Sequence, residues 1–504
     1  MSAKNEKTHV DSVSVSLDAG LELAASQFEL SLEVNSIPRI TIELLPIEAK
    51  KGSFGASAPT FGEITALYNK LSSISKNLDN KANIKISVTS YGSKNSEQKI
   101  ELKDWILSDV GLSSVTSYSA PTIAAIFNHP SYRLVRTGTI YENPNDSCLD
   151  IKLGSVSGGN IISLMDGVYK KFSSEILFYD IGKSVEHGKD VADVRQIVKK
   201  FRTDLAEANN LPGTYIDCSS SLFLEKHFTG DKKALLVTAL ANIAQPFFAS
   251  GSTWHRIVQS ICPACLMHVV PTYTLGKLKL EPAEPWQNFS YEIPESCIES
   301  IELPPEDPDP LIGVAVQRDN MSPDPVSDDC TTRREQPFSS KYAFYIPEGV
   351  NPESPQGRIE FIGDSTVITC IEQMNACPLS ESASDDSTKH TRTLTKIEDL
   401  IGAEDNYAQA MFELLYRKNC TAAVTTTMMF NDSKGNVIHP GRTMRISEKS
   451  SASKVLFTGY LVKTFVRGAV GGPCVSIYTM THTRPSGDAR SSILIPDGAS
   501  NPCY

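Results

Sequence analysis

The 504-residue sequence has no cluster of basic residues. Lys and Arg number 48 against 59 Asp and Glu, the formal net charge is −11, and the cations are scattered along the chain. Direct binding of nucleic acid needs gathered cations that neutralise several phosphates at once. The composition therefore argues against sequence-specific binding of nucleic acid, although an acidic surface would repel DNA that passes close to it.

The sequence also lacks a long apolar segment. Its first residues, MSAKNEKTHVD, are polar and contain no core of a secretory signal. The most apolar stretch, Ala234 to Ala249, is shorter than the roughly 20 residues of a membrane helix and contains Asn242 and Gln245. We therefore expect a protein without a membrane segment that is made in the cytoplasm.

The local motifs of common catalytic and nucleotide sites are absent as well. The chain contains neither G-x-S-x-G nor H-E-x-x-H, and it has no G-x-G-x-x-G or Walker loop. Gly154 to Asn160 is glycine-rich without the phosphate-binding lysine, and the serines at 219–221 have no flanking glycines. We interpret the first as a loop and the second as a strand edge. Paired glycosidase carboxylates leave no local motif, so a hydrolase of that kind stays open.

The eleven cysteines do not have the pattern of a disulfide framework. An odd number in a long chain without a signal sequence indicates mostly reduced thiols. Cys262 and Cys265 have C-x-x-C spacing, with His268 nearby, as in a redox pair or half of a zinc site. The next cysteine in the chain, Cys297, is remote and has no companion at the usual spacing. We predict structural cysteines at 262 and 265, with a metal site or a disulfide or redox pair as alternatives.

What the sequence does contain is a series of strand patterns near its C-terminus. A helix pattern at Ala403 to Asn419 precedes strand patterns at Thr421 to Phe430, Arg442 to Ile446, Val455 to Arg467 and Val475 to Thr483. The third covers about thirteen residues, against about five or six in a typical strand, so we expect it to bend. Gly459 lies where the bend is needed, because a residue without Cβ tolerates close approach of another chain segment.

Two parts of the chain resemble a known protein family. The order of helix, strand, turn, PGRTMRI, LFTGYLVKTFVRG, a glycine-rich turn and a strand ending in THTRP resembles the C-terminal barrel of phage tail hub proteins. These are the baseplate hubs of contractile tails and the hub parts of VgrG-type spikes. Phe28 to Leu45, FELSLEVNSIPRITIELL, is similar to the opening hairpin of the same family. The resemblance covers the first and last thirds of the chain well and the middle in general layout.

The resemblance implies a fold, a role and partners. The fold would be a β-rich α+β fold with two tail-tube-like antiparallel barrels and an inserted α/β domain. The role would be that of a structural virion protein without catalytic, cofactor-binding or metal residues. It would be made in the host cytoplasm and would join the tail tube to the central spike or tip of a contractile injection system. Three chains would form a pseudo-sixfold ring around a channel for DNA or tape-measure protein.

The charge of that channel follows from the need for DNA to slide without sticking. A wall of like charge avoids the affinity that cationic grooves have for phosphates. We therefore predict a net acidic wall, which the charge of −11 permits.

Composition and pattern divide the chain into four parts. Residues 1–149 begin with a polar arm and predict the first barrel with one helical connection. Residues 150–287 predict the α/β insert, and residues 288–485 predict the second barrel with Pro/Asp-rich linkers. Residues 486–504, rich in Ser, Pro and Gly, predict a C-terminal arm.

Apolar spacing predicts further helices and strands within these parts. Helices are expected at Phe61 to Lys81, Asp190 to Asn210, Lys232 to Phe248 and Thr253 to His268, and strands at Ile84 to Ser90, Lys99 to Leu107, Arg133 to Glu142, Leu275 to Leu280, Leu311 to Gln317, Lys341 to Ile346 and Arg358 to Glu372. Two functions of other classes stay open. One is a tail-associated cell-wall or polysaccharide hydrolase, and the other is a thiol or metal enzyme built on Cys262, Cys265 and His268.

Overall fold

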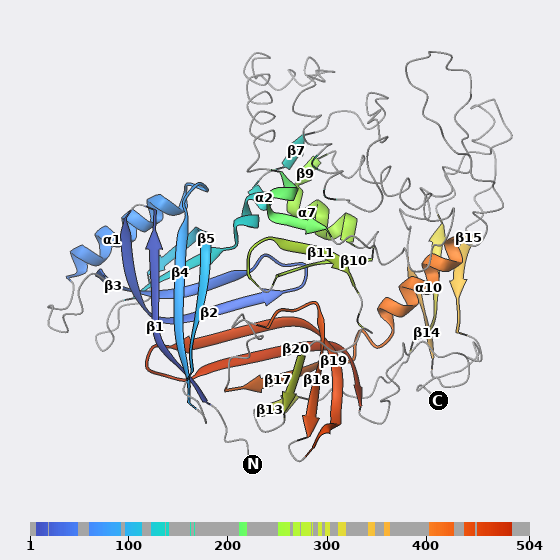
Figure 1. The fold of residues 1–504 in the computed structure, drawn as a ribbon. Helices are drawn as coiled ribbons and strands as arrows, with labels where there is room; N and C mark the ends of the chain where they lie inside the picture. Colours follow the sequence, from blue (N-terminus) through green and yellow to red (C-terminus); the bar gives the residue numbers. More distant parts are fainter. Residues whose placement is uncertain are drawn as a thin grey trace, which may run out of the picture.

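The computed structural model is dominated by β-strands (Figure 1). It describes residues 7–18, 20–48, 60–91, 96–112, 122–136, 138–140, 162, 166, 211–218, 250–262, 266–272, 274–283, 285, 291–294, 298–302, 311–318, 341–347, 357–362, 403–427, 438–448 and 451–485. Twelve of the described strands form one large, mainly antiparallel sheet, with three smaller sheets beside it. The β-rich fold class predicted from the sequence is confirmed.

Six strands from the N-terminal third form what we call the first strand unit. They are β1 (Lys7–Leu17), β2 (Leu21–Glu33), β3 (Arg39–Glu48), β4 (Ala82–Tyr91), β5 (Ser96–Leu112) and β6 (Ile123–Asn128). They pair in the order β1-β4-β5-β6-β3-β2, and β1 also pairs with β2, so the pairing returns to its start. Alternate residues such as Leu30 and Leu32 are fully buried in one core, because successive side chains point to opposite faces of a strand.

Helix α1 (Phe61–Ser75) covers part of this core. Thr60 and Glu63 form a capping box at its first turn, in which each side chain accepts a hydrogen bond from the other's backbone N–H. Ile64 and Leu71 are buried against the core cluster. The predicted helix therefore exists and ends six residues before Lys81.

Two predictions in this region were wrong. The polar arm expected at the N-terminus includes strand β1, whose bulge between Val10 and Ser12 interrupts the alternation of apolar residues. The strand expected from Arg133 is instead a helical turn, α2 (Arg133–Arg136), followed by the short β7 (Gly138–Ile140). Leu134 of this turn is completely buried. Strand β6 carried no prediction.

Six strands from the last two thirds form the second strand unit. They are β12 (Tyr291–Pro294), β13 (Ile298–Glu302), β17 (Ala422–Thr426), β18 (Arg442–Glu448), β19 (Ser451–Ala469) and β20 (Cys474–Pro485), in the order β12-β18-β19-β20-β17-β13. Only the β12–β18 pairing is parallel. A second core cluster lies here and includes Val424, Met444, Leu461 and Tyr478. Helix α10 (Ala403–Leu415) precedes β17, as predicted.

The long strand β19 is irregular where the sequence predicts a bend. The register of its pairing with β20 shifts between Thr458 and Tyr460, which places the irregularity at Gly459. A Cβ on Gly459 would lie 2.9 Å from the Cβ of Met480 and 2.9 Å from Cγ2 of Thr483. Glycine is therefore required by the close approach of β20.

The described elements outside the two units form smaller sheets and short helices. One sheet consists of β8 (Ile216–Cys218), β10 (Met267–Val270) and β11 (Leu278–Pro282), and another of β14 (Leu311–Arg318), β15 (Lys341–Tyr345) and β16 (Arg358–Ile362). Short helices α5 (Pro212–Tyr215) and α7 (Thr253–Arg256) accompany them, and β9 (Ser250–Ser252) pairs with β7.

The helix predicted from Thr253 to His268 is therefore shorter than expected. It continues as a π-helical stretch, Ile257–Ile261, and strand β10 begins at Met267. The helices expected at 190–210 and 232–248 lie outside the described residues. Among the helices that the structure describes, none has both the length and the apolar character of a membrane span.

Candidate functional site

The two strand units are joined into one sheet by the antiparallel pair of β2 with β19, and Val10 of β1 adds backbone hydrogen bonds to Gly471 and Gly472 in the β19–β20 turn. The register runs from Glu33 opposite Lys463 to Gln27 opposite Ala469. Lys463 Nζ lies 3.2 Å from Glu33 Oε2, and the backbone N–H of Val34 donates to the carbonyl of Val462 at 2.9 Å. Backbone pairing thus links the N-terminal and C-terminal strands, blue and red in Figure 1, into one sheet.

This joint creates a continuous outer face that crosses both units. On β2, Leu30 and Leu32 point into the core, so Glu29, Ser31 and Glu33 point outward. Ser31 is opposite Phe465, and Phe465 is opposite Ile477, so one row of outward positions crosses three strands without a break. We call this surface, formed by the outward residues of β3, β2, β19 and β20, the shared face.

The shared face carries charges of both signs. Glu29, Glu33 and Glu43 face outward together with Arg39, Lys463 and Arg467. The joint is therefore close to electrically neutral, unlike the whole chain. The shared face therefore does not have the excess of carboxylates that the predicted acidic channel wall requires. Such a wall would have to be formed by other surfaces of the protein.

A hairpin from the middle of the chain, β10–β11, contacts both strand units at this joint. Asn35, in the β2–β3 turn with φ 61°, donates its N–H to the carbonyl of Val269 at 2.8 Å. Its side-chain Oδ1 accepts from the N–H of Val269, also at 2.8 Å. On the other side, the guanidinium of Arg442 in β18 makes a two-point contact with Glu281 of β11, and the Nη2 to Oε1 distance is 3.0 Å.

Close packing tightens the same contact. Gly441 has φ +86°, a conformation that glycine adopts readily, and a Cβ there would lie 2.5 Å from Cγ1 of Val270. The β10–β11 hairpin is thus fixed to the first unit through Asn35 and to the second through Gly441 and Arg442. We call these contacts the hairpin clamp.

Three histidines bridge elements around the clamp. His129, 1% exposed, uses Nε2 to donate to the carbonyl of Gly276, while Nδ1 accepts from the N–H of Ser131 at 3.2 Å. His268 Nδ1 lies 3.3 Å from the hydroxyl of Tyr460 on β19. His482 Nε2 donates to the carbonyl of Leu414 in α10 at 2.8 Å.

All three histidines are held neutral by their surroundings. Burial lowers the pKa of His129 to about 4, because the low-dielectric interior disfavours the imidazolium. Burial also lowers the pKa of His268 to about 4 and that of His482 to about 3, and the charge of Lys418 adds to both effects. These side chains therefore serve as uncharged hydrogen-bonding links between elements.

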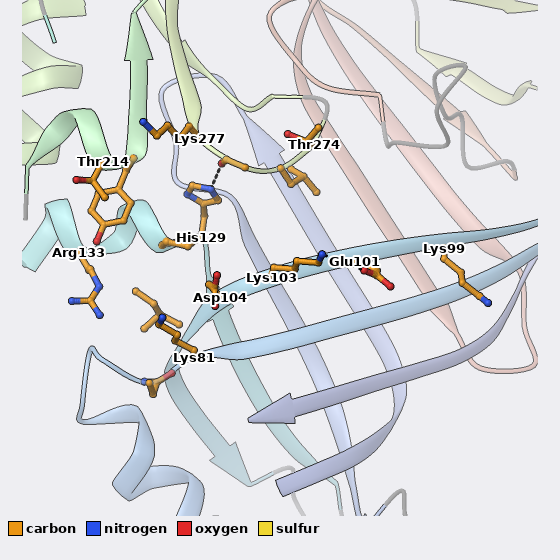
Figure 2. Close-up of a pocket in the computed structure, with 16 residues that line it drawn as sticks. Lys81, Lys99, Glu101, Lys103, Asp104, His129, Arg133, Thr214, Thr274 and Lys277 are labelled. Carbon is orange, nitrogen blue, oxygen red and sulfur yellow. Dashed lines mark hydrogen bonds and ion pairs between the residues drawn. The ribbon is translucent and has the colours of Figure 1, made fainter. Parts of the chain in front are cut away.

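A polar groove lies beside the clamp, between the first strand unit and the β10–β11 loop (Figure 2). Its volume is about 730 Å³. The lining comes from β5 and the turn before β4, from α2 and its preceding turn, and from α5 and the loop that ends at Lys277. Figure 2 shows the side chain of His129 directed at this loop.

The candidate residues from the sequence are only partly described. Cys262 is 1% exposed, and burial raises the pKa of its thiol, so it stays protonated and is a poor nucleophile or ligand. Cys265, Cys297, the serines at 219–221 and Gly154 to Asn160 lie outside the described residues. No group of three or more His, Cys, Asp or Glu that could hold a metal ion occurs in the part of the chain that is described.

Neither the clamp nor the groove is predicted by the sequence. Asn35 lies within the predicted Phe28 to Leu45 hairpin, but its partner Val269 is 234 positions away. No local pattern connects the two. Gly441 directly precedes the predicted strand Arg442 to Ile446, and its close contact with Val270 has no signal in the sequence.

Comparisons with known proteins found similarity in structure only. No family model matches the chain, and neither does any curated protein. A tail protein from Neisseria meningitidis is 9% identical with a TM-score of 0.43, over 97% of this chain and 98% of that chain. The 43 kDa tail protein of prophage MuSo2 from Shewanella oneidensis is 8% identical with a TM-score of 0.42, over 93% and 97%.

A third similar structure is a component of the type VI secretion system of E. coli, which itself has structural similarity to the T4 bacteriophage tail proteins gp27 and gp5. It is 8% identical with a TM-score of 0.34, over 94% of this chain and 76% of that chain. The similar structures are tail proteins and VgrG-related proteins, the kinds that the sequence resemblance names. Because these TM-scores lie below 0.5, the function proposed next depends on this chain's own residues and strand pairings.

Proposed function

We propose that the chain is a structural tail or baseplate hub that assembles as a homotrimer and joins a tail tube to a central spike or tip. The observation that carries this proposal is the β2–β19 joint, which sets two strand units side by side in one sheet. Three chains with two such units each supply six positions around a ring. A ring of this kind matches a sixfold tube on one side and a threefold spike on the other.

The two units share a design that supports this pseudo-sixfold arrangement. Each contains three consecutive antiparallel strands, β4-β5-β6 and β18-β19-β20, and the middle strand is the longest of its unit. Strand β5 has 17 residues and β19 has 19. In the proposal both units are tail-tube-like barrels. Residues 1–149 and 288–485 provide the barrels, residues 150–287 the α/β insert and residues 486–504 an arm.

We infer the contact between subunits from the edges of the large sheet. In the first unit the pairing of β1 with β2 closes the order of strands. In the second unit, β13 pairs with β17 and β12 with β18, and neither has a second strand partner among the described residues. Unpaired edges recruit strands from other chains or must be covered. We therefore expect a neighbouring copy to cover the side of β12 and β13.

Electron microscopy of the purified chain tests this proposal. The expected image is a ring with a central hole, three lobes and two similar densities per lobe. Compact single particles without a hole would refute the hub. Mixing the ring with tail tube protein should then give rings stacked end to end on discs of tube protein. This result would test the tail tube directly as a partner.

The hydrolase alternative has little support in the groove. A glycosidase acid needs a carboxyl group in an apolar, water-poor environment. The groove carboxylates Glu101 and Asp104 are both exposed on β5. The proposal therefore assigns no catalytic, cofactor-binding or metal residue. The structural role of Cys262 and Cys265 stays a prediction, and stoichiometric zinc in metal analysis of the purified protein would overturn it.

A further inference from the structure

The β10–β11 hairpin contains two leucines in a strained backbone conformation. Leu266, which directly precedes β10, has φ 52°, and Leu275, in the loop at the tip of the hairpin, has φ 50°. This left-handed conformation is uncommon for residues with a bulky side chain, because their Cβ comes too close to the following carbonyl oxygen. The contacts of the hairpin with its surroundings therefore hold both leucines in a conformation that they would leave if released.

The tip of the hairpin is inserted into the first strand unit. Leu275 is buried and belongs to the core cluster of that unit, although it comes from the middle of the chain. Its N–H donates to the carbonyl of Thr272 at 3.0 Å, which closes the turn at the tip. The carbonyl of the next residue, Gly276, accepts the hydrogen bond from Nε2 of His129 (Figure 2). The first unit therefore holds the tip through an apolar contact and a buried hydrogen bond.

A buried tryptophan lies next to this contact. Trp105 on β5 meets the ring of His129 edge-on, with 6.0 Å between the ring centroids and 86° between the planes. Its indole N–H has no acceptor among the residues that the structure describes. A buried donor without an acceptor is unfavourable, and this penalty ends when the donor reaches water. Withdrawal of the tip would therefore relieve Trp105 as well as the two leucines.

The hairpin is attached to the two strand units by side chains rather than by strand pairing. It belongs to a three-stranded sheet with β8, and among the described strands neither β10 nor β11 pairs with the large sheet. The hairpin clamp supplies the other attachments, through Asn35 on the first unit and through Gly441 and Arg442 on the second. The hairpin can therefore separate from both units without breaking a strand pair within either of them.

We propose that the β10–β11 hairpin is a strained strap that opens and closes as a whole while both strand units stay folded. In the closed state Leu275 fills the first core, and in the open state Leu275 and Trp105 meet water and the groove that Leu275 lines becomes wider. Exposure of apolar side chains keeps the open state a minor one, and release of strain favours opening by roughly a factor of ten for each leucine. The inference concerns the single chain and does not depend on the hub assignment.

Hydrogen exchange of the full chain, measured by mass spectrometry at several low concentrations of urea, tests the strap. Peptides from the hairpin should exchange through an opening that urea hardly affects, because it exposes little surface, whereas peptides from β2 should exchange through global unfolding, which urea promotes. Arg442→Gln removes the ion pair with Glu281 and should speed exchange around Leu275 by about tenfold. The matched control is Lys463→Gln, because it removes an ion pair, with Glu33, that joins the two units outside the hairpin.

The fluorescence of Trp105 gives a second reading in a Trp254→Phe/Trp286→Phe background, where no other tryptophan remains. Acrylamide should quench it more strongly when Arg442→Gln is added, and to an unchanged extent when Lys463→Gln is added. Exchange of the hairpin together with β2 at every urea concentration would overturn the proposal, since the hairpin would then open only with the whole chain. Faster exchange near Glu281 without faster exchange at Leu275 would overturn it too, and so would an equal effect of the control.

Discussion

At the scale of single residues, substitutions at two glycines can distinguish the effect of a steric clash on stability from the effect of backbone strain. Gly441 and Gly471 both have positive φ, +86° and +77°, but a Cβ on Gly441 would clash with Val270, whereas nothing lies within 4 Å of one on Gly471. Gly441→Ala should therefore lower the free energy of unfolding by more than Gly471→Ala. The shared backbone strain costs about 1 kcal/mol or more, and the clash adds about 1–3 kcal/mol for Gly441 alone.

Chemical denaturation of both variants measures this difference. Hydrogen exchange at the Val269 amide gives a second reading, because a loosened hairpin clamp would expose it. Equal losses of stability in the two variants would show that the contact with Val270 does not hold the hairpin.

The buried histidines predict a dependence of stability on pH. The pKa of His129 is about 4 in the folded chain, against an ordinary value of 6.5. The unfolded chain therefore binds protons at a pH where the folded chain does not, so stability is highest above pH 6.5 and falls as the pH drops toward 4. The full effect is of the order of 3 kcal/mol for one such histidine.

Unfolding of the chain at pH 7 and at pH 5 checks this prediction. His129→Asn removes one titrating group and should make the loss between the two pH values smaller. A stability that does not change, or that rises on acidification, would contradict the assignment of a neutral buried histidine.

At the scale of elements, β1 closes the pairing order of the first unit. It pairs with β4 over most of its length and with β2 at its end. Deletion of residues 1–17 should expose the edges of β4 and β2. It should also uncover the core side chains that pack against Val13 and Val15, so the chain should become less stable and prone to aggregation. Deletion of residues 1–6 leaves β1 whole and is the control. Thermal unfolding and light scattering measure both effects, and equal behaviour of the two deletions would refute the closing role.

The elements that could be predicted are those with a local signal. The Phe28 to Leu45 hairpin and the strands from Arg442 to Thr483 have alternation and turn residues within a few positions, and the structure contains them. Strand β1 was missed because its bulge places Val10 and Val13 three positions apart instead of two. The helical turn at Arg133 was missed because the burial of Leu134, a tertiary contact, outweighs the local strand propensity.

Most of the candidate site could not be predicted from the sequence, for the same reason. The clamp joins Asn35 to Val269 and Arg442 to Glu281, and these pairs are 234 and 161 positions apart. Hydrogen-bond partners at such separations are fixed by the assembled sheets. The groove has the same origin, because β5 and the loop at Lys277 meet only once the chain has folded.

At the scale of the whole molecule, each chain would form one third of the proposed ring. Its two strand units lie side by side through the β2–β19 pairing, and the hairpin clamp fixes a third segment to both. A rigid pair of similar units is what a pseudo-sixfold ring requires of each subunit. In the proposed ring each chain supplies two units that are similar but have different free edges, so that three chains, rather than six, would complete the circle.

The mass of the purified chain in solution tests this central claim most directly. Light scattering over a range of concentrations should give about three times the 55.0 kDa of one chain. The variant Ile301→Lys, on the β13 edge where we place the subunit contact, should shift the equilibrium toward the single chain. A stable monomer of 55.0 kDa at the highest concentration reached, with the fold intact by circular dichroism, would contradict the account.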